Sequence, residues 1–390
     1  AVHVEEIAPT LAADEALAPA VLADDVVETK VKDPEDTHAK APHHNPDDIR
    51  LDMKPFTDNV QMDTIGTILM TFLITLSNAG GVSGAGSNIP IMLIFYGLTM
   101  KESVPLSAFV GVVATVFRFV LNYSQKHPNR PERNIINYEV VEITMPAVFF
   151  GTFLGVILNQ MCGDVVKLSI FGTTVAWSIW TTFKKARQLM EKERKQAQVT
   201  INENSQLIEE DNQEAVQAEE AQTPEMAQIK KEEQYHFTSG RLAFILINFS
   251  ILFATQVAYK SNSVSPLMKK VIFAAFGFAM FVVTYYSVHK VKKIHEVKAR
   301  DGYHFDANDT RFDSFSDVVS LSIFCMIAAV LCGLTGIAGG MVLGPLFLKY
   351  NMLPSIMSGT NQYITMVSSI SVAVQFVYIG YLNYYYSALF

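Results

Sequence analysis

Two glycine-rich stretches of apolar sequence decide the fold class of this chain: GGVSGAGSNIP at residues 80–90 and TGIAGGMVLGP at residues 335–345. A shift of 255 positions aligns three pairs of residues: Gly81 with Gly336, Gly84 with Gly339, and Pro90 with Pro345. Each copy follows an apolar segment and precedes a short apolar run, a polar turn and a longer apolar segment. Two similar halves, each with a membrane helix interrupted by glycine, are the best sequence signal for the binding site of a secondary transporter.

The composition indicates a polytopic membrane protein rather than a soluble enzyme. Half of the 390 residues are apolar and the mean hydropathy is +0.22, although the chain contains two long polar regions. The apolar residues must therefore be concentrated in runs that are long enough to span a bilayer. The cysteines Cys162, Cys325 and Cys332 form no zinc-binding pattern, so we expect small packing residues and no metal or cofactor. No basic run interleaved with aromatic residues indicates nucleic-acid binding.

Apolar segments of helix length recur along the chain, and two shorter ones follow the glycine stretches. The sequence predicts long spans at residues 62–78, 105–123, 140–161, 165–183, 242–258, 270–288, 317–334 and 358–381, and short helices at 88–98 and 345–351. The predicted fold is all-α: a polytopic membrane protein with two inverted repeats that contain glycine-broken helices.

The polar regions divide the chain into six parts. The predicted parts are an acidic, mostly disordered exoplasmic arm at 1–58, a first transmembrane repeat at 59–183, a charged cytoplasmic insertion at 184–240, two additional transmembrane helices at 241–288, a cytoplasmic loop at 289–316, and a second repeat at 317–390 that is incomplete at its C-terminus. The arm has few aromatic residues. The insertion favours helix, and it is either a solvated loop or a docking arm for a protein partner.

The basic residues predict how the chain is oriented in the membrane. Lys and Arg are concentrated in residues 124–139, at the start of the insertion and in residues 289–300, so all three should face the cytoplasm. The span at 62–78 then runs inward and the span at 317–334 runs outward, as an inverted repeat requires. The chain begins at Ala1 and not at Met, so either a presequence was removed or the numbering starts inside the precursor. A signal peptide favours the plasma membrane or an endomembrane, and a mitochondrial presequence is the alternative.

The chain resembles the TauE/SafE family of sulfite-exporter-like membrane proteins. Three elements of each half carry this resemblance. The first half offers Gly81, Gly84, Gly86 and Pro90, then VPLS (104–107) and NIINY (134–138); the second offers Gly336, Gly339, Gly340 and Pro345, then SGTN (358–361) and YLNY (381–384). The third glycine of the family pattern is Ser87 in one half and Met341 in the other. The insertion and the extra pair of spans resemble the longer eukaryotic members. The resemblance implies export of sulfite or of small organosulfur anions.

A helix that is interrupted inside the membrane leaves backbone groups unpaired, so its break must face protein or a water-filled cavity. The short helices are predicted to start near Asn88 and Gly344, where free N–H groups and the positive end of the dipole suit a small anion. The predicted substrate-binding residues are Gly81, Ser83, Gly84, Gly86, Ser87, Asn88, Ser107, Gly336, Gly339, Gly340, Thr360, Asn361 and Gln362. The alternative roles are helix capping or interhelical bonds for the polar residues and close packing for the glycines.

Three charged residues lie in or beside predicted spans. Arg118 is a candidate for gating or for holding charge, and the alternative is a side chain that extends to the cytoplasmic surface. Glu139 and Glu142 begin the span at 140–161 and are candidates for a proton relay or for a solvated helix start.

Two functions fit these observations. The first is a secondary anion transporter, which the intact first repeat favours. The second is a non-transporting scaffold subunit of a larger complex, anchored through the arm or the insertion, which the incomplete second repeat favours if Phe390 is the true terminus. An enzyme is not expected, because no nucleophile–base arrangement or metal cluster is present in the sequence.

Overall fold

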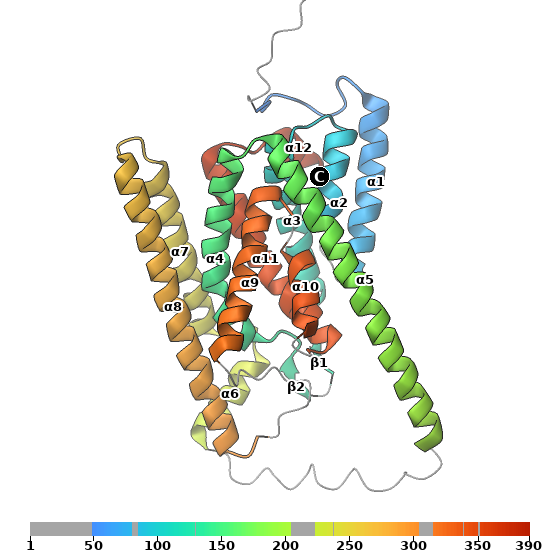
Figure 1. Cartoon of the computed structure of the whole chain (residues 1–390), viewed down its shortest axis with the longest axis vertical. Helices are drawn as coiled ribbons and strands as arrows, with labels where there is room; N and C mark the ends of the chain where they lie inside the picture. Colours follow the sequence, from blue (N-terminus) through green and yellow to red (C-terminus); the bar gives the residue numbers. More distant parts are fainter. Residues whose placement is uncertain are drawn as a thin grey trace, which may run out of the picture. The chain divides into compact units, whose positions relative to one another are not determined.

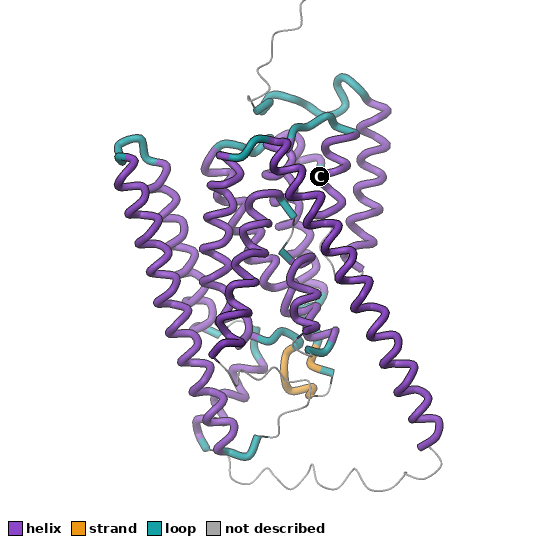
Figure 2. Tube along the Cα trace, viewed as in Figure 1, coloured by secondary structure: helices purple, strands orange, loops and turns teal. Residues whose placement is uncertain are grey.

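The computed structural model describes residues 49–79, 85–128, 130–203, 223–236, 238–303, 315–337, 339–349 and 352–390. Its helices are α1 (Val60–Ala79), α2 (Ala85–Ile94), α3 (Met100–Leu121), α4 (Tyr138–Met161), α5 (Asp164–Glu203), α6 (Pro224–Gln234), α7 (Ser239–Lys260), α8 (Pro266–Arg300), α9 (Phe315–Thr335), α10 (Gly340–Lys349), α11 (Pro354–Ile379) and α12 (Tyr384–Leu389). A short antiparallel hairpin, β1 (Lys126–His127) with β2 (Arg130–Asn134), is drawn in orange in Figure 2.

Seven of the described helices are long and apolar enough to cross a membrane: α1, α3, α4, α7, α8, α9 and α11. The chain is therefore an all-α, multi-pass integral membrane protein. The predicted span at 165–183 lies within α5, which is not one of the seven. The helices α2 and α10 have 10 residues each. Such a helix is about 15 Å long, roughly half the hydrocarbon thickness, and it cannot cross alone.

The two halves of the bundle run in opposite directions in Figure 1. Helix α1 begins at the end where residues 49–59 lie, and α9 begins at the end where β1, β2 and α6 lie, which we call the basic end. The basic sequences at 124–139, in the second half of α5 and in the last turns of α8 all lie toward this basic end (Figure 1). This agrees with the prediction that the three basic sequences lie on the same side of the membrane. An internal symmetry that relates the two halves stays a prediction.

The centre of the bundle is the tight packing of α4 against α9, which we call the α4–α9 seam and define by Gly151, Gly155 and Gly333. A Cβ atom built on Gly155 would lie 2.4 Å from the carbonyl oxygen of Val330, and one on Gly151 would lie equally close to the carbonyl oxygen of Met326. Small residues four positions apart let two membrane helices approach backbone to backbone. The cysteines Cys325 and Cys332 of α9 are buried among the apolar side chains around this seam.

Two helices extend further than the hydropathy pattern predicts. Helix α5 continues through the charged sequence KKARQLMEKERKQ to Glu203, and α8 continues through residues 289–300, which the sequence assigns to a loop. Lys, Arg, Glu and Gln are good helix formers, so the end of an apolar run marks the membrane surface and not the end of a helix.

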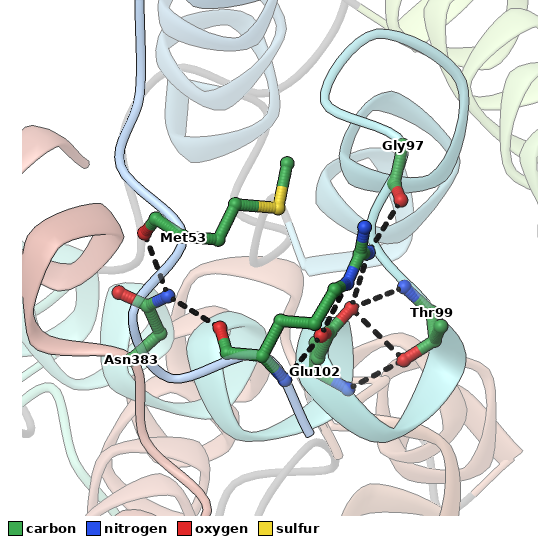
Figure 3. Close-up of polar contacts among 6 residues, drawn as sticks. Met53, Gly97, Thr99, Glu102 and Asn383 are labelled. Atoms are coloured by element: carbon green, nitrogen blue, oxygen red, sulfur yellow. Dashed lines mark hydrogen bonds and ion pairs between the residues drawn. The ribbon is translucent and has the colours of Figure 1, made fainter. Parts of the chain in front are cut away.

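Part of the segment assigned to the arm is bound to the bundle, as Figure 3 shows. The Arg50 guanidinium donates to both carboxylate oxygens of buried Glu102, at 2.9 and 2.8 Å. Glu102 also accepts from the backbone N–H of Thr99 and completes the capping box at the start of α3. Asn383, just before α12, donates to the carbonyl oxygens of Arg50 and Met53. Residues 1–48 of the predicted arm lie outside the described residues.

Ion pairs at the basic end attach part of the insertion to the bundle. Lys298 of α8 is buried and contacts Glu139 of α4 and Glu233 of α6, both at 2.6 Å. Glu142 accepts from Lys290 at 2.8 Å. Glu139 and Glu142 therefore do not form a solvated helix start, because both are bound to side chains of α8. The described residues of α6 therefore pack on this chain's own helices; residues 204–222 of the insertion are outside the described residues.

Candidate anion site at the helix breaks

The break between α9 and α10 is bound by side chains from other helices. Ser107 of α3 donates to the carbonyl oxygen of Gly336 at 3.0 Å. Asn159 of α4 donates to the carbonyl oxygen of Leu334 at 2.7 Å. Gly336 itself has φ +71, in the left-handed region that favours glycine, so the chain leaves α9 at this residue. Both carbonyls would otherwise lack a partner inside the membrane, where each unpaired group is costly.

Two further side chains bind the first turn of α10. Ser178 of α5 donates to the carbonyl oxygen of Met341 at 2.8 Å, and Asn361 of α11 donates to the carbonyl oxygen of Gly340 at 3.0 Å. Four helices thus each supply one donor to the backbone around this break. The backbone at this break is therefore stabilised by hydrogen bonds from four different helices.

The glycines at the start of α10 leave room for polar side chains of α11. A Cβ atom built on Gly340 would lie 2.8 Å from the hydroxyl oxygen of Thr365 and 3.1 Å from the amide nitrogen of Asn361. A Cβ atom on Gly339 would lie 3.8 Å from the hydroxyl oxygen of Ser368. The helix start can therefore approach hydroxyl and amide groups closely because it has no side chains of its own there.

Some of these polar atoms have no hydrogen-bond partner within the described part of the chain. They include the side-chain oxygens of Asn361 and Thr365 on α11 and of Asn88 on α2. All three residues are buried, with exposed fractions of 4%, 1% and 1%. A buried polar atom without a partner costs about 1–3 kcal/mol. Three such side chains near the helix breaks are therefore candidates for contact with a bound polar group.

The first turn of α2 meets the first turn of α10. A Cβ atom built on Gly86 would lie 2.4 Å from the methyl carbon and 2.6 Å from the sulfur of Met341. Ser87, which precedes Asn88, is half-buried in the same turn. The two short helices therefore begin beside each other, and the Met341 side chain occupies the space between them. The predicted residues Gly81, Ser83 and Gly84 lie outside the described residues.

Two of the predicted binding residues contact other parts of the bundle. The hydroxyl oxygen of Thr360 accepts from the backbone N–H of Asn137 at 2.9 Å, before α4. The amide oxygen of Gln362 accepts from Asn122, after α3, at 3.2 Å. These bonds join the start of α11 to the basic end. Asn361, between them, faces the break.

Arg118 lies in a separate cavity of about 720 Å³ between α1 and α3. Its guanidinium donates to the hydroxyl of Ser358 at 2.9 Å, and Asn122 lines the same cavity. Asn78, at the last turn of α1, lines the opposite wall and stands two residues before the first glycine stretch. A cation and several amide and hydroxyl groups thus line a space that extends from the basic end toward that stretch.

Three residues of the break were not identified from the sequence: Asn159, Ser178 and Thr365. Thr365 was recognisable, because Asn361, Thr365 and Ser368 follow each other at spacings of four and three and share one face of α11. Asn159 is a single amide near the end of an apolar span, and Ser178 lies in α5, far from both glycine stretches in sequence. No sequence pattern indicates that either side chain contacts the break.

The arrangement suits a small anion. The start of a helix presents free N–H groups and a partial positive charge, and hydroxyl and amide side chains add neutral donors. The unpartnered Thr365 hydroxyl can donate to an anion, whereas the unpartnered atoms of Asn361 and Asn88 are amide oxygens, which accept and therefore suit an O–H group of a protonated ligand.

Comparisons with known proteins agree with the sequence resemblance. The family profile described as Sulfite exporter TauE/SafE matches residues 231–390. Sulfite exporter TauE/SafE family protein 1 of Arabidopsis thaliana is 23% identical over 84% of this chain and 74% of its own length. Family protein 2 of the same plant is 23% identical over 81% of this chain and 70% of its length. No solved structure matches the chain significantly. Residues 231–390 of the chain thus match the Sulfite exporter TauE/SafE family model, and most of the chain is similar to the plant proteins of that name.

Proposed function

We propose that this protein transports a small anion, sulfite or an organosulfur anion, across a membrane by alternating access around the starts of α2 and α10. The observation that carries the proposal is the start of α10, which lies inside the bundle beside the unpartnered hydroxyl of Thr365. A bound oxyanion would accept from the free N–H groups of the helix start and from the Thr365 hydroxyl.

The Arg118 cavity supports a direction for this transport. It lies toward the basic end, which the positive-inside rule assigns to the cytoplasm. An anion would be attracted to the guanidinium at this end and would reach the breaks from there, as an exporter requires. We propose the plasma membrane or an endomembrane as the location, with the mitochondrial inner membrane as the alternative, and transport without a cofactor or an enzymatic step.

Sulfite flux into proteoliposomes that contain the full chain tests the proposal. Thr365→Val removes one hydroxyl and keeps the shape of the side chain. Thr144→Val is the matched control, because Thr144 is equally buried and its hydroxyl binds only carbonyls of its own helix, such as that of Val140 at 2.8 Å. We expect flux to fall about tenfold in Thr365→Val, equivalent to about 1.4 kcal/mol, and to persist in Thr144→Val.

One observation favours the second candidate, a non-transporting scaffold subunit. The Met341 side chain fills the space between the first turns of α2 and α10, where a binding site would need room. The flux experiment tests the first function: a folded protein that moves none of sulfite, sulfate and a sulfonate under an imposed gradient is not a transporter of these anions, which leaves transport of another anion or the scaffold function.

A further inference from the structure

An apolar groove separates α8 from α9 on the outside of the bundle. Both helices pack on α4, and Phe150 of α4 lies at the floor between them. The groove has a volume of about 380 Å³. Phe281 and Tyr285 of α8 form one wall, and Val319 and Ile323 of α9 form the other. Because these helices cross the membrane, the groove faces lipid.

The length of the groove matches one leaflet of a bilayer. On α8 its wall extends from Gly277 to Val288, which is about 17 Å along a helix. The hydrocarbon core is about 30 Å thick, so the groove covers about half of it. On α9 the wall begins at Val318, close to the start of that helix at the basic end. The groove therefore runs from the basic end to the middle of the membrane.

The same face of α8 becomes basic where the groove ends. His289 lies one turn beyond Tyr285, and the two rings are in edge contact at 4.4 Å. Lys292 lies one turn beyond Val288, and its side chain is exposed. By contrast, Lys290 is bound to Glu142, so its charge is already paired. An exposed cation directly above an apolar groove suits a lipid phosphate above its acyl chain.

The groove also contains one polar group. Ser322 of α9 lines it and is buried, and its hydroxyl oxygen has no partner within the described part of the chain. A serine hydroxyl can donate to the carbonyl of a lipid ester, which an unsubstituted hydrocarbon occupant does not offer.

We propose that this groove is a binding site for one anionic phospholipid of the leaflet at the basic end. One acyl chain lies between α8 and α9, and the phosphate contacts Lys292 and His289. The exposed charged side chains on this turn are Lys292, Lys293 and Glu296, so cations predominate. This site is distinct from the anion site at the helix breaks and does not depend on transport.

Native mass spectrometry of the full chain in detergent, with phosphatidylglycerol or phosphatidylcholine added, tests the site. Lys292→Gln removes the headgroup contact, and Lys270→Gln, an exposed lysine at the other end of α8, is its control. Ile323→Trp fills the groove. Phe324→Trp is its control, because Phe324 is similarly exposed, 43% against 47%, but does not line the groove.

We expect one equivalent of phosphatidylglycerol to remain bound to the unchanged chain. The affinity for this lipid should fall about tenfold in Lys292→Gln and in Ile323→Trp, whereas both control variants should bind it as the unchanged chain does. Equal retention of phosphatidylcholine would overturn the proposal, since the groove would then select no headgroup. Equal loss in the controls, or displacement of the lipid by inorganic phosphate alone, would also overturn it.

Discussion

Glycines bring chain segments into close contact at two places in this bundle, the α4–α9 seam and the start of α10, but different atoms lie opposite them. At the seam, a Cβ on Gly155 would meet the backbone of Val330 and Gly333. At the start of α10, a Cβ on Gly340 would meet the ends of the Thr365 and Asn361 side chains. Backbone cannot move aside without separating two helices, whereas a side chain can change rotamer.

This difference distinguishes two uses of glycine that a membrane sequence alone does not separate. The seam glycines serve packing, and every atom opposite them is fixed. The α10 glycines face polar side chains that carry unpartnered oxygens, as a site for a ligand does. Substitution should therefore damage stability at the seam and transport at the start of α10.

The largest effect is expected from Gly155→Ala. The added methyl group lies 2.4 Å from the Val330 carbonyl oxygen, so α4 and α9 must separate, at a cost of about 2 kcal/mol or more. Gly172→Ala in α5 is the control, because nothing lies within 4 Å of that position. Alanine there should stabilise the helix by up to about 1 kcal/mol. Thermal unfolding in detergent should show a lower Tm for the first variant and an equal or higher Tm for the second; equal shifts would contradict the distinction.

A smaller change in stability and a larger change in function are expected from Gly340→Ala. The methyl group displaces the Thr365 hydroxyl and the Asn361 amide by a few tenths of an ångström. We expect sulfite flux to fall about tenfold while Tm changes little. Gly344→Ala is the matched variant, since its nearest side-chain atom, the Asn361 amide nitrogen, lies at 3.9 Å. If Gly344→Ala loses as much flux, the loss reflects α10 as a whole rather than the polar contacts.

Met341→Ala should change selectivity more than stability. The shorter side chain leaves space between the first turns of α2 and α10, so a bulkier organosulfur anion should gain flux relative to sulfite. Met341 is half-buried, so the loss of stability should be below the roughly 2–5 kcal/mol of a fully buried methionine. Competition between sulfite and a sulfonate in proteoliposomes measures the change. An unaltered ratio would show that Met341 does not limit the site.

The smallest effect is expected at the basic end, where no glycine is involved. His236 joins the α6–α7 connection to the bundle: its Nδ1 accepts from the Tyr138 hydroxyl at 2.8 Å and its Nε2 donates to the Tyr123 carbonyl at 2.7 Å. Burial lowers the pKa of His236, and the nearby Lys126 and Arg241 lower it further. A histidine that is released from the bundle takes up a proton near pH 6.5, whereas the bound His236 stays neutral to a lower pH. The contact between the α6–α7 connection and the bundle is therefore fully stable above about pH 6.5 and weakens as the pH falls below it.

Hydrogen exchange of residues 223–236 at pH 7.5 and 5.5, corrected for the intrinsic rate, measures this weakening. His236→Gln should remove most of the difference between the two pH values. A difference that persists in the variant would assign the effect to a group other than His236.

The long helices were predictable because long apolar runs are unambiguous. The two short helices were predictable because a glycine-rich stretch precedes each of them and the apolar run that follows is too short to span the membrane. The predicted starts of the short helices at Asn88 and Gly344 differ from the observed starts at Ala85 and Gly340. This shift places Gly86, Asn88 and Gly340 in the first turns. Asn361 and Ser107 are predicted binding residues because they lie near the repeated motifs, and both donate to backbone carbonyls at the second break. Those bonds depend on helices that meet only in the folded bundle, so the sequence could not show them.

The Ser178 bond to the Met341 carbonyl joins α5 directly to the first turn of α10. Helix α5 continues 25 residues beyond Ser178 to Glu203, a distance of about 38 Å along the helix. If α10 moves and α5 follows it through this bond, a tilt of about 10° displaces the far end of α5 by about 7 Å. A small rearrangement around the break would thus become a displacement of several ångströms outside the membrane, where a probe attached to the last turns of α5 could follow it.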